Sequence, residues 1–342
     1  MGQSFEIKYR LSNENNRMKR KQKVLVTGAG GFIGHHLVSY LKKKGYRVRG
    51  VDIKYPEYKP TDADEFFKLD LREKNNAFKA TEGMNHVYAL AADMGGMGYI
   101  SANHATILYN NATINFNTME GARVNKVSRY FYSSSACIYP EYRQTKAKMK
   151  PLKEEDAFPA QPQDAYGWEK LVTEILAKYY REEYGIETRI ARFHNIFGPF
   201  GTWDGGREKA PAAICRKIAT AKLMGKKEIE IWGDGKQTRS FCYIDDCLEG
   251  IYKLMLSDFP DPLNIGQDRM VTVDQLVDII SEIAGVELKK IHVAGPQGVR
   301  GRNSDNSKLR KVLKWEPGIS LEQGLVKTYQ WIEEQVSNKL NK

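Results

Sequence analysis

The sequence predicts an α/β protein: a doubly wound parallel sheet followed by a smaller C-terminal lobe. Between residues 23 and 198, short runs rich in β-branched and aromatic residues alternate with longer amphipathic stretches of helical period. A glycine-rich turn joins the first run to the first amphipathic stretch, which indicates an open doubly wound sheet rather than a barrel. The length of 342 residues also suits a large and a small unit, at roughly 150 residues per domain.

The first predicted unit is a strand, a helix and a second strand. Residues 23–28 (KVLVTG) form an apolar run that stops at a glycine, as a buried strand does. Residues 32–41 repeat apolar side chains at helical spacing, and Lys44-Gly45 is a typical helix end. Residues 46–52 (YRVRGVD) predict the second strand. The two strands must then be parallel and joined by a right-handed crossover.

The alternation continues along the chain, and its texture changes after residue 198. Before that point we expect strands near 86–91, 129–134 and 187–193, and helices near 105–125 and 164–184. After a glycine-rich loop we expect helices at 210–223, 272–284 and 320–337, and short strands near 228–232 and 241–244. The chain is therefore divided into a basic tail (1–22), a sheet domain (23–198) and a smaller, partly interleaved lobe (199–342).

Charge and composition exclude several classes of protein. Hydrophobic residues (41%) and charged residues (28%) are in globular proportion, which excludes a disordered or fibrous chain. Part of the formal charge of +11 lies in the basic tail, and the rest could equally steer an acidic small substrate, so charge alone does not decide the partners. We expect no nucleic-acid partner. No apolar run is long enough to span a bilayer, and we expect no membrane segment.

The cysteines and the N-terminal residues indicate a cytoplasmic protein. Cys137, Cys215, Cys242 and Cys247 show no CxxC spacing, which argues against a structural zinc site and for a reducing compartment. Residues 1–22 lack the apolar core of a secretory signal. We therefore expect a cytoplasmic protein that holds no metal.

The turn TGAGGFIG (27–34) between the first strand and the first helix indicates a dinucleotide site. Gly28 permits the tight turn, Gly31 lets the backbone approach a pyrophosphate, and Gly34 lets the helix pack close to the sheet. Phe32 and Ile33 open the helix, whose N-terminal N–H groups favour phosphate. We assign these five residues to cofactor binding.

Two acidic residues are assigned to the adenosine end of the dinucleotide. Asp52 ends the second predicted strand, where a carboxylate can bind both ribose hydroxyls and repel a 2′-phosphate. This favours NAD over NADP, although Lys54 could accommodate phosphate. Asp70, in FFKLDLRE, resembles the acid that meets the adenine in this class of protein, and as an isolated residue it would be a strand-end cap.

Tyr166 and Lys170 lie four residues apart, on one face of a predicted helix. The ammonium of Lys170 and the positive ring of an oxidised cofactor would lower the pKa of the Tyr166 phenol. Tyr166 could then take the proton of a substrate hydroxyl as hydride leaves its carbon. Ser135 follows a predicted strand and could hydrogen-bond the same oxygen. The three residues predict oxidation of a hydroxyl group by NAD.

Several motifs together resemble the extended short-chain dehydrogenase/reductase superfamily, from about residue 22 to 335. They are the glycine turn, SSSACIYP (133–140), YGWEK (166–170), RFHNIFGPFG (192–201) and TRSFCYIDD (238–246). Three further segments are similar to the GDP-mannose 3,5-epimerase family: AADMGGMGYI (91–100), FHNIFGPFGTWDGGREKAPAA (193–213) and GPQGVRGRNSDN (295–306). The N-terminal 22 residues and KLMGKKE (222–228) depart from that pattern.

The resemblance implies a Rossmann domain at 23–198 that binds NAD tightly, and a nucleotide-sugar lobe at 199–342. It implies conversion of GDP-α-D-mannose to GDP-β-L-galactose, with GDP-L-gulose as a by-product. Tyr166, aided by Ser135, would take the C4 hydroxyl proton, and the resulting ketone acidifies the hydrogens at C3 and C5. The family's acid/base pair carries over as Cys137 and Lys209, one on each side of the sugar ring.

The same resemblance implies a set of binding residues. Tyr166, Lys170 and Asn195 would also contact the cofactor. Arginines suit the diphosphate because one guanidinium can bond two oxygens. His194 is expected to satisfy a local hydrogen bond and not to bind metal. The substrate-binding residues would be Gly95, Ser135, Ala136, Cys137, Asn195, Glu208, Lys209, Ala210, Lys217, Gln237, Arg239 and Arg302.

Two other functions stay open at this stage. One is another NAD-dependent nucleotide-sugar enzyme: a 4,6-dehydratase would be expected to carry Asp-Glu in place of Ala136-Cys137, and a simple 4-epimerase has no use for Cys137 and Lys209. The other is a regulatory or RNA-binding relative that binds NAD without turnover, and such relatives commonly lose Tyr166 or Lys170. The family also implies a homodimer formed through a helix pair, one helix carrying Tyr166.

Overall fold

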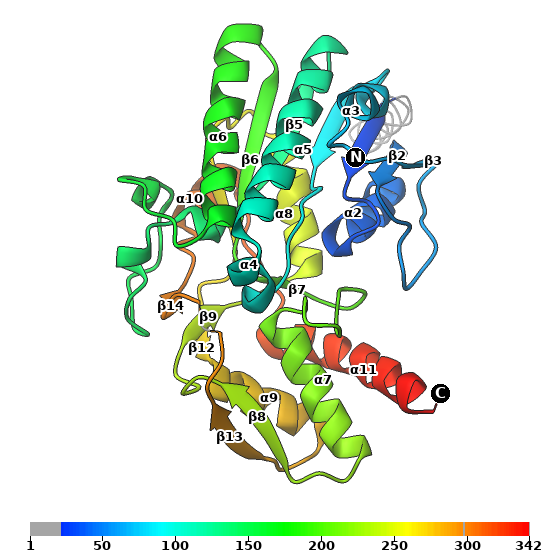
Figure 1. Cartoon of the computed structure of the whole chain (residues 1–342). Helices are drawn as coiled ribbons and strands as arrows, with labels where there is room; N and C mark the ends of the chain where they lie inside the picture. The colour runs from blue at the N-terminus through cyan, green and yellow to red at the C-terminus, as the bar shows by residue number, and fades with distance from the viewer. Residues whose placement is uncertain (1–21, 297, 342) are drawn as a thin grey trace, which may run out of the picture. The chain divides into compact units, whose positions relative to one another are not determined.

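The computed structural model describes residues 22–296 and 298–341 (Figure 1). The predicted basic tail therefore lies outside the described residues, apart from Gln22. None of the helices in the described ranges is both long and apolar enough to cross a membrane.

A seven-stranded sheet confirms the doubly wound α/β class. The described pairings of neighbouring strands are parallel, and the chain runs outward from β1 in one direction and then in the other, as in a Rossmann sheet. The strand order is β11 (Leu263–Ile265), β6 (Glu187–Phe193), β5 (Arg129–Ser135), β4 (His86–Ala89), β1 (Lys23–Thr27), β2 (Arg47–Asp52) and β3 (Glu65–Lys68).

The chain forms two compact units, and both are discontinuous in sequence. Of the described residues, unit 1 consists of 22–92, 112–132 and 176–188, and unit 2 of 93–111, 133–175, 189–296 and 298–341. Two long helices, α5 (His104–Val124) and α6 (Ala165–Tyr184), each contribute residues to both units. The boundary at 198–199 expected from the sequence differs from this division, because unit 2 includes two segments of the N-terminal half.

Unit 1 is built on strands β1 to β4. The central strand β1 is buried along Val24, Leu25 and Val26, so it reads as a continuous apolar run rather than an alternating one. Helix α2 (Phe32–Lys43) buries Leu37 and Leu41, which repeat at helical spacing. Helix α3 (Lys74–Thr81) completes the described elements that lie wholly in this unit, and Figure 1 shows α2 and α3 beside the strands in blue.

Unit 2 contains a helical layer and three small sheets. Helices α7 (Ala210–Leu223), α9 (Val273–Ala284) and α11 (Leu321–Leu340) pack against one another, as Figure 1 shows. The remaining helices are α4 (Met97–Ala102), α8 (Ile244–Leu256) and α10 (Ser307–Leu313). The small sheets pair β7 (Ile196–Phe197) with β10 (Cys242–Tyr243), β8 (Glu228–Trp232) with β13 (Lys289–Val293), and β9 (Thr238–Ser240) with both β12 (Met270–Thr272) and β14 (Gly301–Arg302).

The structure differs from the sequence prediction in a few elements. The strand expected at 241–244 is only two residues long, because helix α8 begins at Ile244 with Asp245 and Asp246 in its first turn, where the helix dipole favours acidic residues. Strand β3 and helix α3 were not predicted, since they are short and only partly buried. Strand β11 was also missed: its three residues are too few to show a period.

Candidate active site

The glycine turn of unit 1 leaves no room for side chains at three positions. Gly28 has a φ of +70°, and a Cβ there would lie 2.8 Å from the Ala91 nitrogen. A Cβ on Gly30 would lie 2.2 Å from the Lys54 carbonyl oxygen, and one on Gly34 would lie 2.1 Å from the Gly28 oxygen. At Gly31 the nearest atom would be 3.3 Å away, so Gly30 is the tighter of the two central glycines.

The turn and the start of α2 fit a dinucleotide phosphate. Gly31 is the N-cap residue, and no side chain of the described residues caps the helix there. The first turn, which begins with Phe32 and Ile33, contains no acidic residue, and a helix N-terminus attracts an anion. A turn kept free of Cβ atoms also lets a ligand approach the backbone closely.

The two predicted adenosine residues of unit 1 lie in different surroundings. Asp52 ends β2, where its carboxylate accepts hydrogen bonds from the backbone N–H of Gly30 (2.9 Å) and Lys54 (3.2 Å). Burial raises the pKa of Asp52, against the lowering effect of these bonds. Asp70 instead pairs with Arg72, and that hydrogen-bonded pair lowers its pKa. Asp52 is therefore hydrogen-bonded to the glycine turn itself, whereas the charged carboxylate of Asp70 is paired with Arg72.

In unit 2, Ser135 and Tyr166 lie in direct contact. Ser135 ends β5 and accepts a hydrogen bond from the Cys137 N–H at 3.1 Å. The Ser135 and Tyr166 side chains are hydrogen-bonded, which lowers the pKa of the phenol, but burial and the nearby Cys137 and Glu169 raise it well above its ordinary value. The sequence argument expected a lowered pKa, and the protein groups alone shift it in the opposite direction because the phenol is buried.

Lys170 lies over Tyr166, as the spacing predicts. Its Nζ is 5.5 Å from the centroid of the Tyr166 ring. Lys170 is 1% exposed, and burial lowers its pKa against the raising effect of Glu169 and Cys137. The Glu169 carboxylate lies 3.8 Å from the ammonium and accepts a hydrogen bond from Asn111 at 3.0 Å. A buried carboxylate thus stabilises the buried cation of the predicted catalytic pair.

Cys137 is the residue at which the predicted chemistry converges. Its Sγ accepts a hydrogen bond at 3.1 Å from Nη1 of Arg302, which lies 165 residues later in the chain. The charge of Cys137 also affects the pKa values of Tyr166, Lys170, Lys209 and Arg239. A hydrogen bond from a cationic donor is stronger than one from a neutral donor, so Cys137 has a strong donor beside its sulfur.

Arg302 and Arg239 bring two guanidinium groups together. They face each other in register on the parallel strands β14 and β9. Arg302 also donates to Gln144 Oε1 at 2.7 Å, and Arg239 donates to the carbonyl oxygens of Thr238 (2.8 Å) and Val299 (2.7 Å). Burial and the charge of Arg302 lower the pKa of Arg239 to about 9. An anion between the two groups would relieve this repulsion, as a diphosphate would.

Lys209 is the N-cap residue of α7. Solvent reaches the residue, yet protein surrounds the ammonium closely enough for desolvation to lower its pKa, while the sulfurs of Cys137 and Cys247 raise it. The sulfur of Cys137 and the ammonium of Lys209 therefore lie close enough to interact electrostatically. A thiol and an amine near one another can act as an acid/base couple.

Gln237 directly precedes β9, whereas Lys217 lies on α7 against strand β8. Lys217 donates to the Glu230 carbonyl at 2.7 Å, and its Nζ is 5.6 Å from the Trp232 ring centroid. Gln237 donates to the Trp232 carbonyl at 3.1 Å, and its Oε1 has no hydrogen-bond partner among the described residues. A buried amide oxygen without a donor suits a ligand that supplies one.

The remaining predicted residues support backbone geometry. Asn195 has a φ of +47° and donates to the Ser240 carbonyl at 2.8 Å. The Glu208 carboxylate pairs with Arg216 at 2.7 Å. Gly95 and Ala136 are buried, and Ala210 is the exposed first residue of α7.

Some residues of these sites were not predicted from the sequence. Gly30 stands within the glycine turn, and only its close approach to Lys54 distinguishes it. Glu169 lies inside the YGWEK motif, but the spacing gave no signal for its contact with Lys170, because adjacent residues of a helix do not face each other. His194 Nε2 donates to Asn264 Oδ1 at 3.0 Å, and burial lowers the pKa of His194 to about 3, which agrees with the structural role expected for it.

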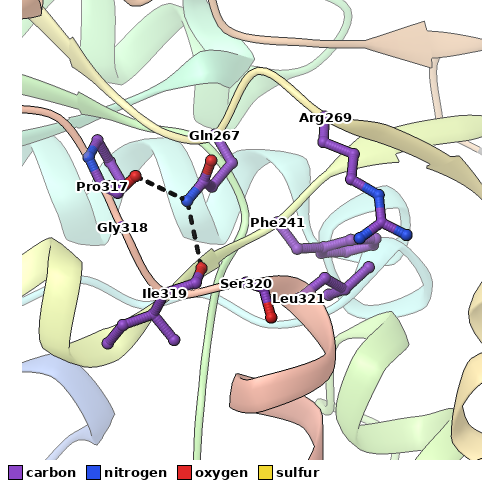
Figure 2. A pocket seen from close by; sticks show the side chains of 8 residues that line it. All are labelled: Phe241, Gln267, Arg269, Pro317, Gly318, Ile319, Ser320 and Leu321. Carbon is purple, nitrogen blue, oxygen red and sulfur yellow. Dashed lines mark hydrogen bonds between the residues drawn. The ribbon is translucent and has the colours of Figure 1, made fainter.

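A separate pocket in unit 2 contains none of the predicted site residues. Figure 2 shows Gln267 pointing into it and donating to the carbonyl oxygens of Pro317 and Ile319, both at 3.3 Å. Arg269 at its rim pairs with Glu322 on α11. Its polar groups thus fix the entry into α11. No group of three or more His, Cys, Asp or Glu that could hold a metal occurs in the part of the chain that the structure describes.

Comparison with known proteins places the chain among sugar-nucleotide enzymes. The model of the NAD dependent epimerase/dehydratase family matches residues 24–266. The chain is 52% identical over 331 residues to the GDP-mannose 3,5-epimerase of Arabidopsis thaliana, covering 96% of this chain and 87% of that protein.

Solved structures share the fold. The UDP-glucose 4-epimerase of Thermotoga maritima, solved with UDP-glucose, has a TM-score of 0.83 and 26% identity, covering 92% of this chain and all of that one. The UDP-glucuronic acid 4-epimerase of Bacillus cereus, solved with UDP-glucuronic acid and NAD, has a TM-score of 0.77 and 25% identity, covering 92% of this chain and 100% of that one.

Proposed function

The chain belongs to the NAD dependent epimerase/dehydratase family, and we propose that it is the member that epimerises GDP-mannose at C3 and C5. The products are GDP-β-L-galactose and, after a single inversion, GDP-L-gulose. The observation that carries this proposal is the hydrogen bond between Arg302 and Cys137 beside Tyr166, because it equips a redox site with a second, separate acid/base group.

The oxidation step uses Tyr166, Ser135 and Lys170. Bound NAD supplies a hydride acceptor for C4 and returns the hydride at the end of each cycle. Tyr166 takes the C4 hydroxyl proton, and Ser135, hydrogen-bonded to the phenol, orients the same oxygen. Because the protein raises the pKa of Tyr166, the positive charges of Lys170 and of the oxidised cofactor must offset that shift for the phenol to act as a base.

The inversion steps use Cys137 and Lys209. A ketone at C4 makes the hydrogens at C3 and C5 acidic, so a moderate base can remove them. Cys137 is the base, and Arg302 stabilises the charge that the sulfur must carry. Lys209 delivers a proton to the other face of the ring, which inverts the carbon, and its lowered pKa makes it a better proton donor.

The nucleotide end of the substrate fits the two arginines. Arg239 and Arg302 can each offer a fork of N–H groups to a diphosphate, and the anion lowers the cost of holding the two cations side by side. Gln237 Oε1 can accept from a donor of the nucleoside, and Lys217 adds a cation nearby. Simple 4-epimerisation would use Tyr166 and Ser135, but the hydrogen bond between Cys137 and Arg302 would have no role in that reaction.

The proposal includes a homodimer and a cytoplasmic location. Helix α6 exposes Trp168 (43%), Val172 (45%), Ile175 (39%) and Tyr179 (49%). These residues repeat at a spacing of three to four, so they form one apolar stripe that a second copy would cover. Light scattering tests this: Trp168→Glu, with Trp232→Glu as the control for an exposed indole elsewhere, should lower the molar mass by half if the stripe is the interface. The location rests on the sequence features alone.

Incubation of purified protein with GDP-mannose in D₂O, without added cofactor, tests the activity. Nuclear magnetic resonance should show both epimers, with deuterium at C3 and C5 and no accumulated NADH. Tyr166→Phe should stop product formation and deuterium uptake, since no ketone forms, whereas Tyr142→Phe, whose exposed hydroxyl donates to the Pro159 carbonyl, should match the wild type. Stoichiometric NADH would instead indicate an ordinary dehydrogenase, and a product inverted only at C4 would indicate a 4-epimerase.

A further inference from the structure

We infer that Arg207 is a positioning residue that holds Lys209 in place for proton delivery. With Tyr99 and Asp93 it forms what we call the Arg207 latch. The inference rests on the proposed function, in which Lys209 supplies the proton that inverts the carbon. It gives a role to three residues that lie within the quoted segments 91–100 and 193–213 but had none, and all of them lie in unit 2.

Arg207 reaches away from the loop that carries it. Its guanidinium carbon lies 3.7 Å from the centroid of the Tyr99 ring, a stacked cation–π contact, and its Nη1 lies 3.6 Å from Asp93 Oδ1. The backbones of the two segments are also linked, because the Gly96 N–H donates to the Arg207 carbonyl at 3.0 Å. A Cβ on Gly96 would lie 2.6 Å from the Glu208 carbonyl oxygen, so the two chain segments touch.

Asp93 is a fixed anchor for this contact. Its Oδ1 accepts from the Tyr99 hydroxyl at 2.9 Å, and its Oδ2 accepts from Asn110 at 3.0 Å. Its own N–H donates to Asn111 Oδ1 at 2.6 Å. Asn111 is fully buried and donates to Glu169 as well. The latch is therefore tied to the frame that holds Lys170 beside Tyr166.

The loop before Lys209 depends on such ties. Gly205 and Gly206 have φ values of +90° and +84°, and no atom of the described residues lies within 4 Å of where their Cβ atoms would be. Half of the Arg207 side chain is exposed, so core packing does not explain its position. Besides the latch, Arg216 pairs with Glu208 and Asp204, Lys339 of α11 pairs with Asp204, and the Gly206 N–H donates to Glu208 Oε2 at 2.7 Å. Two glycines without packing make the loop costly to order.

The position of the latch predicts that its loss affects one catalytic step and not the stability of the whole unit. Lys209 follows Arg207 by two residues, whereas Cys137 and Tyr166 lie on other elements. Loss of the latch should therefore slow protonation by Lys209 while oxidation at C4 and proton removal by Cys137 continue. In D₂O such an enzyme would place deuterium into recovered GDP-mannose, from Cys137 and without inversion, but would form epimers slowly.

The test compares Arg207→Ala with Arg310→Ala, which removes an exposed arginine that pairs with Asp268 and Glu316 elsewhere in unit 2. The measured quantity is the ratio of epimer formation to deuterium exchange in recovered GDP-mannose. We expect Arg207→Ala to lower this ratio about tenfold, equal to about 1.4 kcal/mol at 25 °C, with KM changed less than kcat. Arg207→Lys, which keeps the charge but loses the planar stack, should lie in between.

Amide hydrogen exchange supplies a second measurement, independent of turnover. In Arg207→Ala the amides of residues 204–209 should exchange faster, and those of α6 should not. An unchanged ratio in Arg207→Ala, or a fall of both rates together with the melting temperature, would overturn the latch while the proposed function stands. Absence of epimers from the wild type would overturn both.

Discussion

The two units of the protein build their sites from different parts of the chain. In unit 1 the site is made of backbone. Its defining feature is that a Cβ atom at Gly28, Gly30 or Gly34 would lie too close to neighbouring backbone atoms. In unit 2 the site is made of side chains, and its central contact joins Cys137 to Arg302 across 165 residues. A backbone site is specified by one short stretch of sequence, whereas a side-chain site exists only when distant elements have come together.

This difference predicts two kinds of failure. A backbone site fails sterically, because an added atom has no room and the whole binding turn must move. A side-chain site fails chemically, because the fold persists while one proton or charge is lost. Substitutions in the two units should therefore give distinguishable losses, and the following experiments arrange them from the largest expected effect to the smallest.

Gly30→Ala should remove NAD from the purified protein and with it all activity. The added Cβ would lie 2.2 Å from the Lys54 carbonyl oxygen, and it would also press on Asp52, whose carbon Cγ is 3.1 Å away. Gly318→Ala is the matched control, since no described atom lies within 4 Å of that Cβ position. The NAD content is measured after denaturing the protein, and stoichiometric NAD in Gly30→Ala would show that the backbone site tolerates a side chain after all.

Cys137→Ser should keep NAD but lose most deuterium exchange at C3 and C5. A hydroxyl retains the shape of the thiol and can still accept from Arg302, yet it forms almost no anion near neutral pH. General-base assistance contributes roughly 10²–10⁴-fold, and the exchange rate should fall by about that factor. Cys215→Ala removes a buried thiol of α7 and serves as the control. Wild-type exchange in Cys137→Ser would transfer the role of base to another group.

The part of the site that could be predicted from the sequence also differs between the two units. The glycine turn, Asp52 and the pairing of Tyr166 with Lys170 were predicted, because each lies within one turn, strand end or helix. The side chains around Cys137 could be named only through resemblance to a family. Spacing along the chain carries no information that Arg302 meets Cys137 or that Glu169 stabilises Lys170, since tertiary packing decides both.

The elements that were missed follow the same rule. Helix α8 was not predicted, because the apolar residues Phe241 to Ile244 just before and at its start are typical of a strand. Asp245 and Asp246 nevertheless mark a helix start. Strand β11 is too short for periodicity, and it is identified only by its parallel pairing with β6. Local patterns thus predict an element when it is long, and partners far away in sequence define it when it is short.

Arg239→Ala should weaken the binding of GDP without changing the NAD content. Hydrogen bonds to charged groups are worth about 1.5–3 kcal/mol, so the dissociation constant should rise roughly 10- to 150-fold. Binding by the variant should also depend less on salt, because one cation is gone. Arg269→Ala, which removes an exposed partner of Glu322, is the control for calorimetry. Equal GDP affinities in the two variants would exclude Arg239 from the diphosphate site.

Each unit also contains a buried histidine, and here the two should behave alike. Burial lowers the pKa of His86 in unit 1 to about 4 and that of His194 in unit 2 to about 3. Both stay neutral when folded but take up a proton near pH 6.5 when unfolded, so their stabilising effect is complete above that pH and is lost as pH falls toward those values.

Between pH 7 and pH 5 each histidine should therefore cost about 2 kcal/mol of unfolding free energy. Urea unfolding at both pH values measures this, with His86→Gln and His194→Gln each reducing the difference. His104→Gln is a control on an exposed histidine. A pH dependence that neither substitution reduces would assign acid sensitivity to other groups.

The distance between Cys137 and Arg302 in the chain has a consequence for protein synthesis. At roughly 5–20 residues per second, a ribosome needs about 8 to 33 s to add the 165 residues between them. The glycine turn, by contrast, has β1 and β2 on either side within residues 23–52. A nascent chain therefore contains its glycine turn well before it can form the contact between Cys137 and Arg302, and the thiol remains without its guanidinium until residue 302 has been synthesised.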